Sequence, residues 1–203
     1  MRQNLADKTI LNALKKLRLG KCSPETDMFL KSLDRPLEGD SVDIFFTKLS
    51  VQLHNQESLY RLPGELLTFS CIDEGNVSGI NCPADVKLLL KEGVKVMTLW
   101  NISVSAKNGT SGRFVGVKDD KREVEVLNHE CIFETSDLVQ KRQVWKGNWK
   151  RHTVLFYACT CHKTQGLTLP LAVVHCSKEF VSGVLYVAIS RVCHPDHLRV
   201  LMH

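Results

Sequence analysis

The sequence contains no apolar run that approaches the roughly 20 residues of a membrane-spanning helix. Its first residues, MRQNLADKTI, lack the apolar core of a secretion signal. No internal repeat, low-complexity tract or long linker interrupts the chain either. These absences argue against a membrane-spanning or secreted protein, so we expect an intracellular protein with no membrane partner.

A complete phosphate-binding loop is also absent. Gly20 and Lys21 look like the end of one, but the pattern requires a glycine where Lys15 stands and a hydroxyl residue at the position of Cys22. The segment LLTFSCIDE at residues 66–74 imitates a strand that ends in a magnesium-binding acidic pair. Without a phosphate loop, that likeness carries little weight.

The cysteines are scattered, and most of them have apolar neighbours; they are residues 22, 71, 82, 131, 159, 161, 176 and 193. In a chain without a secretion signal, this pattern is typical of reduced, buried thiols. Residues 159–162 and 193–197 bring cysteine and histidine close together, but their spacing is irregular compared with that of structural zinc sites. We therefore expect these residues to hold no zinc ion.

The composition is that of an ordinary globular protein. The chain has 203 residues, 43% of them hydrophobic and 24% charged, which is enough for one large domain or two small ones. Its 27 basic and 22 acidic residues give a net charge of +5. That charge permits a polyanionic partner but does not require one.

The sequence pattern in the first third of the chain predicts three helices and a strand. Apolar residues at a spacing of four and three predict a helix that ends at Gly20, and Ser23-Pro24 predicts the cap of a second helix. An apolar run at residues 43–47 predicts a buried strand. A third helix is expected over residues 48–62.

In the rest of the chain, the pattern of apolar and polar residues changes at two points. Residues 93–101 alternate, and residues 105–127 show two strands around a charged turn, which predicts a small antiparallel barrel or sandwich. From His152 onward the apolar runs become continuous, as in strands covered on both faces by helices. This order predicts one parallel-sheet α/β domain interrupted by a small β insertion.

The most specific segment is CHKTQGLTL at residues 161–169, which sets a polar turn between apolar runs. About twenty residues later comes YVAISRV, residues 186–192. A loop that only joins elements needs no imidazole, ammonium, hydroxyl, amide and glycine in one turn. Together the two segments resemble the last two signature motifs of superfamily 1 helicases, nearest to the Pif and RecD-like branch, whose members carry TIHKSQGLTL and YVALSR.

Further segments resemble the same family in the same order along nearly the whole chain. Arg2-Gln3 with LNALKKLRLG is similar to the family's FRQ motif and the helix that follows it. The segment FFTKLSVQLHNQESL is similar to the motif PTNxxVxxIN. Three more segments are similar to the strands that enter and form an inserted barrel: LPGELLTFSCIDEG, CPADVKLLLKEGVKVMTLWN and NGTSGRFVGV. The chain departs from the family pattern at Lys48, Thr164 and Pro170, where the family has asparagine, serine and an acidic residue.

The resemblance implies a RecA-like parallel-sheet domain, the second motor domain of such a helicase, interrupted by a small antiparallel β-barrel of the Src-homology type. We expect residues 1–80 and 149–203 to form the RecA-like domain and residues 81–148 the inserted barrel. The first motor domain, with its phosphate loop, is expected to be missing. The chain then corresponds to the C-terminal half of a helicase, from a truncated gene model or a degenerate copy.

The resemblance also implies roles for individual residues. Arg191 matches the family's arginine finger, its catalytic arginine. The expected nucleotide-binding residues are Arg2, Gln3, Gln165, Gly166 and Arg191, and the expected DNA-binding residues are Thr47, His162, Lys163 and Thr164. The expected cofactors are ATP and Mg²⁺, bound mainly by the missing domain, and the expected partner is single-stranded DNA.

The family's function implies part of an ATP-dependent 5′–3′ DNA helicase of DNA repair, recombination and telomere maintenance, in the nucleus or alternatively the mitochondrion. Because half of the ATP site is absent, the 203 residues alone are expected not to hydrolyse ATP. Two alternatives therefore stand beside the first: a catalytically silent nucleic-acid-binding module, and a transposon-derived remnant.

Two further features allow both a nucleic-acid and a structural interpretation. Trp100, Trp145 and Trp149 are candidate base-stacking platforms, but packing in the core or at barrel edges is the simpler explanation. Residues 141–151, KRQVWKGNWKR, are the most basic stretch of the chain. A solvated connector explains this stretch as well as a DNA contact does.

Overall fold

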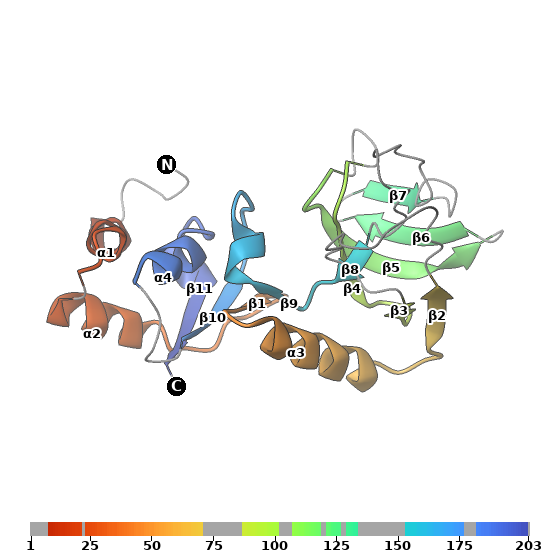
Figure 1. Cartoon of the computed structure of the whole chain (residues 1–203), viewed down its shortest axis with the longest axis horizontal. Helices are drawn as coiled ribbons and strands as arrows, with labels where there is room; N and C mark the ends of the chain where they lie inside the picture. Colours follow the sequence, from red (N-terminus) through yellow and green to blue (C-terminus); the bar gives the residue numbers. More distant parts are fainter. Residues whose placement is uncertain are drawn as a thin grey trace, which may run out of the picture. The chain divides into compact units, whose positions relative to one another are not determined.

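The structure is a computed structural model that describes residues 8–21, 23–70, 87–101, 107–118, 121–126, 129–133, 153–176 and 182–202. The chain divides into two compact units: residues 1–55 and 157–203 form the first, and residues 56–156 form the second (Figure 1). In the described part of the chain, every helix is too short or too polar to cross a bilayer.

The first unit is built on a four-stranded parallel sheet with the strand order β11-β10-β1-β9. Its strands are β1 (Val42–Phe45), β9 (Ala158–Thr160), β10 (Ala172–Cys176) and β11 (Leu198–Met202). The inner strands β1 and β10 carry the fully buried side chains of Ile44, Ala172 and Val174. Such apolar strands are typical of a parallel sheet that helices cover on both faces.

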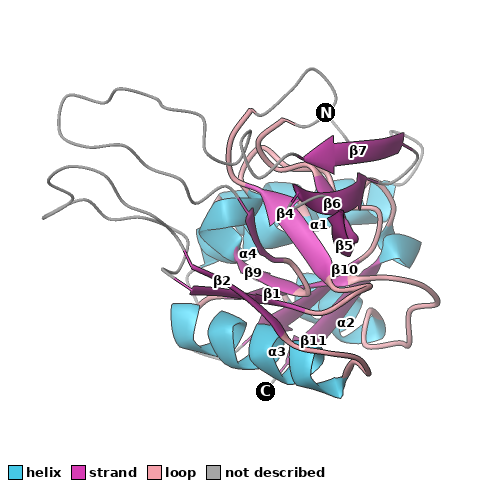
Figure 2. Cartoon of the chain, turned by 90° about the vertical axis from the view of Figure 1, so that its right-hand side faces the viewer, coloured by secondary structure: helices cyan, strands magenta, loops and turns pink. Residues whose placement is uncertain are grey.

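Helices lie on both sides of this sheet (Figures 1 and 2). The helices of the unit are α1 (Lys8–Arg18), α2 (Pro24–Ser32), the first turns of α3 (Lys48–Arg61), and α4 (Ser182–Ile189). α1 packs against α4 on one side, and α3 begins on the other. Ile10, Leu14 and Leu17 of α1 are buried, as their spacing predicts.

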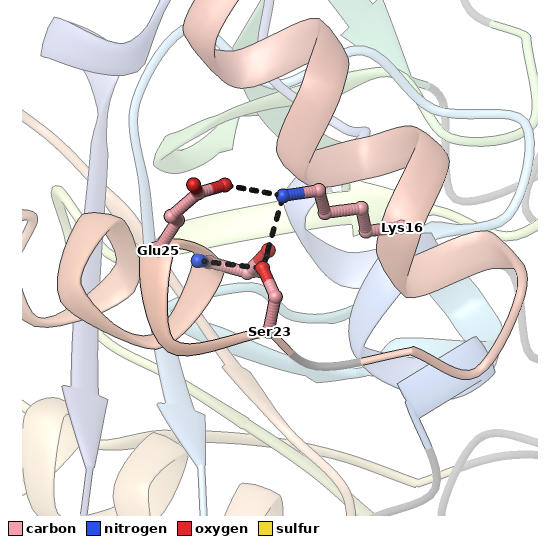
Figure 3. A network of polar contacts seen from close by, with 4 residues as sticks. Lys16, Ser23 and Glu25 are labelled. Atoms are coloured by element: carbon pink, nitrogen blue, oxygen red, sulfur yellow. Dashed lines mark hydrogen bonds and ion pairs between the residues drawn. The ribbon is translucent and has the colours of Figure 1, made fainter.

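The start of α2 shows how the sequence sets a helix boundary. Ser23 is the N-cap: its Oγ accepts a hydrogen bond from the Thr26 N–H at 3.4 Å, and Pro24 occupies the first turn. Lys16 of α1 donates to the Ser23 Oγ at 3.0 Å and pairs with the Glu25 carboxylate at 2.6 Å (Figure 3). The hydrogen bond and the charge of Lys16 lower the pKa of Glu25. A lysine of one helix therefore supports the cap of the next.

Asn55 of α3 covers the outer edge of β9. The Asp43 N–H donates to the Tyr157 carbonyl at 2.9 Å, so by strand alternation the backbone groups of Ala158 face away from β1. The Asn55 Nδ2 donates to the Ala158 carbonyl at 3.0 Å, and its Oδ1 accepts from the Ala158 N–H at 2.8 Å. One side-chain amide thus satisfies an edge that a further strand would otherwise pair.

The second unit contains an antiparallel strand pair and a five-stranded antiparallel sheet with the order β7-β6-β5-β4-β8. The pair consists of β2 (Leu67–Ser70) and β3 (Lys87–Leu90), and the sheet of β4 (Lys95–Thr98), β5 (Ser111–Lys118), β6 (Lys121–Val126), β7 (His129–Phe133) and β8 (Thr153–Leu155). The fully buried ring of Phe114 meets Phe69 edge to face, with ring centroids 6.0 Å apart. The predicted β insertion is therefore antiparallel, and its closure into a barrel stays a prediction.

One expectation about strands is confirmed and another is wrong in part. The alternating residues 93–101 predict a strand of an antiparallel unit, and β4 lies in the antiparallel sheet between β5 and β8, with all its residues buried. The apolar run after His152 predicts strands of the parallel sheet, and β9 is one of them, but β8 pairs antiparallel with β4. An apolar run indicates that a strand is buried, but it does not indicate which sheet the strand joins.

The units divide at 55/56 and 156/157, whereas the predicted domain boundaries lie at 80/81 and 148/149. The second predicted boundary precedes β8, a strand of the antiparallel sheet. Several other predicted features lie outside the described residues: Arg2 and Gln3, Cys22, Cys71 and Cys82, the acidic pair at 73–74, and the basic stretch 141–151 with Trp145 and Trp149. The roles expected of them stay predictions.

Candidate functional site

The polar turn of the HKTQG segment begins where β9 ends. Residues Cys161–Thr164 form a 3-10 helix, η2, directly after Thr160. Thr160 is level with Phe45, the last residue of β1, so Thr47 follows the neighbouring strand at the same edge of the sheet. Ligands of α/β proteins bind at this carboxyl edge of the strands. The fold therefore brings the polar turn and Thr47 to the edge where a site is expected.

Backbone hydrogen bonds hold the turn after β9 in a tight bend. The Gln165 N–H donates to the His162 carbonyl at 3.2 Å, and the Leu167 N–H donates to the Thr164 carbonyl at 2.9 Å. Gly166 has φ +93°, a conformation that other residues rarely adopt, although a Cβ there would meet no atom within 4 Å. The glycine is thus required by backbone conformation and not by space.

The bend presents some of its side chains to solvent and hides others. His162 and Gln165 are exposed, and Lys163 is half-buried. Thr164 is fully buried, and its Oγ1 donates to the Cys161 carbonyl at 2.6 Å. The expectation that the Thr164 side chain touches DNA does not fit this burial, because its hydroxyl is already used to close the bend.

Arg191 lies against the bend, directly after α4. Its guanidinium donates from Nη1 to the Thr164 carbonyl at 3.2 Å, from Nε to the Val187 carbonyl at 2.8 Å, and from Nη2 to the Ser190 Oγ at 2.6 Å. Its own carbonyl accepts from the Leu169 N–H at 2.9 Å. The two segments that carry the family resemblance are therefore in direct contact.

Thr47 caps α3. Its Oγ1 accepts a hydrogen bond from the Ser50 N–H at 3.2 Å and lies 2.7 Å from the Ser50 Oγ. Thr47 is exposed, so this end of α3 is open to solvent. The N–H groups and the dipole of a helix N-terminus favour an anion in this position.

Buried thiols line the interior behind the bend. Burial raises the pKa of Cys159 to about 12 and that of Cys176 to about 12. Burial also raises the pKa of Cys161, although a hydrogen bond with Thr164 and the charge of Arg191 act in the opposite direction. The Cys161 Sγ lies 3.2 Å from the Val184 carbonyl of α4. These thiols are free and protonated at neutral pH, so they act as packing groups.

A second polar cluster, which sequence reasoning missed, ties α3 to the sheet. His175 Nε2 lies 2.5 Å from one carboxylate oxygen of Asp43, and His54 Nε2 lies 3.6 Å from the other. The ring of Phe45 stacks on His175 with centroids 4.1 Å apart. Within the described residues, no three histidine, cysteine or acidic side chains are arranged to hold a metal ion.

The site residues divide into three groups by their placement. The first group lies on or against one bend and consists of Arg191, Gln165, Gly166, His162 and Lys163. Thr47 lies beyond the end of the neighbouring strand. Arg2 and Gln3 lie outside the described residues. Sequence reasoning missed Ser190 and Val187, which bond the guanidinium. The only sign of this role in the sequence is that Ser190 directly precedes Arg191 at the end of a predicted helix.

The parallel sheet, the bend at its carboxyl edge and the arginine that closes on it define a RecA-like α/β domain, with an antiparallel β unit between its two chain segments. No family model matches the sequence. The chain is 30% identical over 214 residues to the ATP-dependent DNA helicase PIF1 of Xenopus laevis, and 31% identical over 215 residues to that of Rattus norvegicus. These alignments cover 96% and 97% of this chain.

Solved helicase structures share the fold. The Pif1 helicase from Candida albicans superimposes with a TM-score of 0.85 over 99% of this chain and 55% of that one, at 23% identity. The Pif1 helicase from Bacteroides in complex with ADP-AlF3 and ssDNA gives a TM-score of 0.72 over 98% of this chain and 50% of that one, at 24% identity. The chain is thus homologous to the Pif1 family of DNA helicases, and it spans about a third of the length of the curated relatives it matches, 33% in both cases above.

Proposed function

We propose that this chain serves as the second motor domain of an ATP-dependent DNA helicase that moves along single-stranded DNA. The observation that carries the proposal is the 3.2 Å hydrogen bond from the Arg191 Nη1 to the Thr164 carbonyl. It joins the arginine expected at the nucleotide to the bend expected at the DNA. In the proposal, this contact couples the arginine to the bend.

On the nucleotide side, the residues of this chain supply positive charge. A phosphoryl group accumulates charge on its oxygens as it is transferred, and a planar guanidinium that stays protonated stabilises that charge. Arg191 takes this role in the proposal, with Gln165 and Gly166 beside it; Arg2 and Gln3 join them by resemblance alone. ATP with Mg²⁺ supplies the transferable phosphoryl group, bound mainly by a first motor domain that brings its own phosphate loop.

On the DNA side, the contacts are with the phosphate backbone. His162 and Lys163 of the bend, and Thr47 at the exposed N-terminus of α3, lie at the carboxyl edge of neighbouring strands. Contacts of this kind hold a single strand without reading its sequence. The Bacteroides Pif1 structure of the same fold contains ssDNA, which supports this assignment. The 5′–3′ direction, the roles in repair, recombination and telomere maintenance, and a nuclear or mitochondrial location rest on the family resemblance.

The test is a chimera in which this chain replaces the homologous third of the Xenopus laevis PIF1 helicase. We expect single-stranded DNA to stimulate ATP hydrolysis by the chimera, and Arg191→Ala to lower kcat by about 10³-fold, as the loss of an arginine finger does. Arg61→Ala is the matched control, because this arginine is exposed and pairs only weakly with Glu57 on the surface of α3. A folded chimera in which Arg191→Ala and Arg61→Ala behave alike contradicts the proposal.

A catalytically silent nucleic-acid-binding module is the second candidate, because the 203 residues contain no phosphate loop. Both candidates predict that the isolated chain hydrolyses ATP no faster than buffer and binds single-stranded DNA with an affinity that falls steeply with salt. Only the helicase predicts activity in the chimera. A transposon-derived remnant predicts neither DNA binding nor chimera activity.

A further inference from the structure

Ser190 lies between the last turn of α4 and the guanidinium of Arg191. Its Oγ donates to the Val187 carbonyl at 3.0 Å and accepts from the Arg191 Nη2 at 2.6 Å. The same Val187 carbonyl accepts from the Arg191 Nε at 2.8 Å. The serine hydroxyl, the Val187 carbonyl and the guanidinium are therefore each hydrogen-bonded to the other two. Ser190 is buried, with only 6% of its surface exposed.

The direction of the serine proton follows from this arrangement. A hydroxyl has one proton, and the guanidinium is a donor only, so Ser190 must turn a lone pair toward Arg191 and its proton toward Val187. The bond to the guanidinium is assisted by charge and is short at 2.6 Å. Ser190 thus binds the arginine and is itself oriented by the helix.

All three guanidinium nitrogens have a fixed acceptor in this set of contacts. Nε is bound by the Val187 carbonyl, Nη2 by the Ser190 hydroxyl, and Nη1 by the Thr164 carbonyl. Three anchored points define the plane of the group. These three acceptors are neutral, so none of these three bonds adds a negative charge beside the guanidinium.

We propose that Ser190 is a positioning residue, which holds the Arg191 guanidinium ready for the terminal phosphate of a nucleoside triphosphate without touching that phosphate itself. The inference rests on the proposed function and adds a residue to it. Ser190 and the two carbonyls fix the plane of the arginine before the nucleotide arrives, so less side-chain freedom has to be lost when the phosphate is engaged.

The central variant is Ser190→Ala, which removes the hydroxyl acceptor and leaves the two carbonyls in place. Ser190→Cys keeps nearly the same volume with a poor acceptor, and therefore serves if the alanine variant folds badly. Ser190→Thr keeps the hydroxyl. The matched control is Ser32→Ala, because Ser32 makes the same kind of bond at the end of α2, to the Phe29 carbonyl at 2.7 Å, with no arginine attached.

The first measurement uses the full 203-residue chain and needs no nucleotide. The Arg191 Nε–H signal is identified in a ¹H–¹⁵N NMR spectrum by its loss in Arg191→Lys. We expect Ser190→Ala to speed its exchange with water by about tenfold, because a guanidinium released at Nη2 breaks its Nε–H bond to the Val187 carbonyl more often. Ser190→Thr and Ser32→Ala should leave the exchange unchanged. An unchanged signal in both Ser190→Ala and Ser190→Cys overturns the inference, whatever the protein's function.

The second measurement is ATP hydrolysis by the Xenopus laevis chimera. We expect Ser190→Ala to lower kcat by about tenfold with little change in the KM for ATP, since the loss falls on orientation and not on ground-state binding. Ser190→Thr should restore kcat, and Ser32→Ala should not change it.

The outcomes separate the two proposals. If Arg191→Ala lowers kcat and Ser190→Ala does not, the positioning role is wrong and the proposed function stands. If Arg191→Ala leaves kcat unchanged, the proposed function is wrong, and the role of Ser190 in turnover is wrong with it. The positioning role is supported when Ser190→Ala both frees the guanidinium in the NMR spectrum and lowers kcat.

Discussion

Asn55 replaces a missing strand neighbour at the edge of β9 with a single amide. It is buried, with 7% of its surface exposed, and its two hydrogen bonds to Ala158 are 2.8 and 3.0 Å long. The amide supplies both the donor and the acceptor that the two Ala158 backbone groups need. The residue is therefore needed for its hydrogen-bonding pattern and not for its volume.

We expect Asn55→Ala to destabilise the chain by about 2–4 kcal/mol, because a buried N–H and a buried carbonyl lose their partners together. Asn55→Asp should also destabilise it, since the carboxylate cannot donate to the Ala158 carbonyl. Gln56→Ala, at the exposed neighbouring position, is the control. Urea unfolding measures the loss, and a change below about 1 kcal/mol for Asn55→Ala contradicts the edge-covering role.

The buried thiols make the stability of the chain sensitive to high pH. Burial raises the folded-state pKa of Cys159 and Cys176 to about 12, above the ordinary thiol value. A group whose pKa is raised on folding contributes its full stability below its unfolded pKa and loses it as the pH rises toward the folded pKa. We therefore expect the free energy of unfolding to fall above about pH 9, by at most about 1.4 kcal/mol per pH unit for each thiol.

The measurement is urea unfolding at pH 8, 9 and 10, in the original chain and in a Cys159→Ala, Cys176→Ala double variant. The double variant should be less stable at pH 8 but lose less stability on going to pH 10. Cys193 is half-exposed and free. Thiol reagents should therefore label Cys193 before Cys159 or Cys176, and the reverse order argues against the burial described above.

At the scale of secondary-structure elements, the N-terminus of α2 depends on contacts from two helices. Ser23 caps α2 and also accepts from Lys16 of α1 (Figure 3). We expect Ser23→Ala to cost about 1 kcal/mol of unfolding free energy, the usual loss for an N-cap. Ser32→Ala at the exposed end of the same helix should change stability by less than about 0.5 kcal/mol. Equal losses for the two variants in thermal unfolding would mean that the cap is not what stabilises the start of α2.

Elements with a local chemical signal were predictable from the sequence. Ser23 and Pro24 determine the start of α2 through backbone chemistry that acts within a few residues, and the two strands predicted on either side of the charged segment are β5 and β6, which pair antiparallel. Membership of a sheet was not predictable, as β8 shows, because the partner of a strand lies far away in the sequence. The antiparallel pairing of β8 with β4 is decided by the tertiary fold.

The candidate site was predictable in its residue types but not in their orientation. The resemblance to helicase motifs pointed to residues 162–166 and to Arg191, and the structure brings these segments into contact. Nothing in the motif distinguishes exposed His162 from fully buried Thr164, because their orientation depends on the closure of the bend onto Cys161. Ser190 was missed since its role depends on where the guanidinium lies.

At the scale of the whole molecule, the two ends of the inserted unit leave the first unit close together. Asn55 and Ala158 are joined by two hydrogen bonds, so the chain enters and leaves the second unit at neighbouring points of the first. The first unit carries its own buried core, with Ile10, Ile44 and Val174 fully enclosed.

We expect a shortened chain, in which a short glycine-serine linker replaces residues 57–155, to fold cooperatively. The reason is that a loop between neighbouring points costs little entropy to close. Circular dichroism and urea unfolding measure the result, with Asn55→Ala in the shortened chain as the control that should weaken it. A shortened chain that stays unfolded in buffer shows that the first unit depends on the second.

The pairing of β1 has a consequence for the synthesis of the protein. Both neighbours of β1 in the sheet, β9 and β10, come from the segment after residue 156. While a ribosome makes the chain, neither strand that pairs with residues 42–45 in the described sheet is available until the entire antiparallel unit has been translated. A long separation between pairing strands slows folding. The second unit is therefore synthesised completely before β1 can pair, and we expect the second unit to fold first during translation.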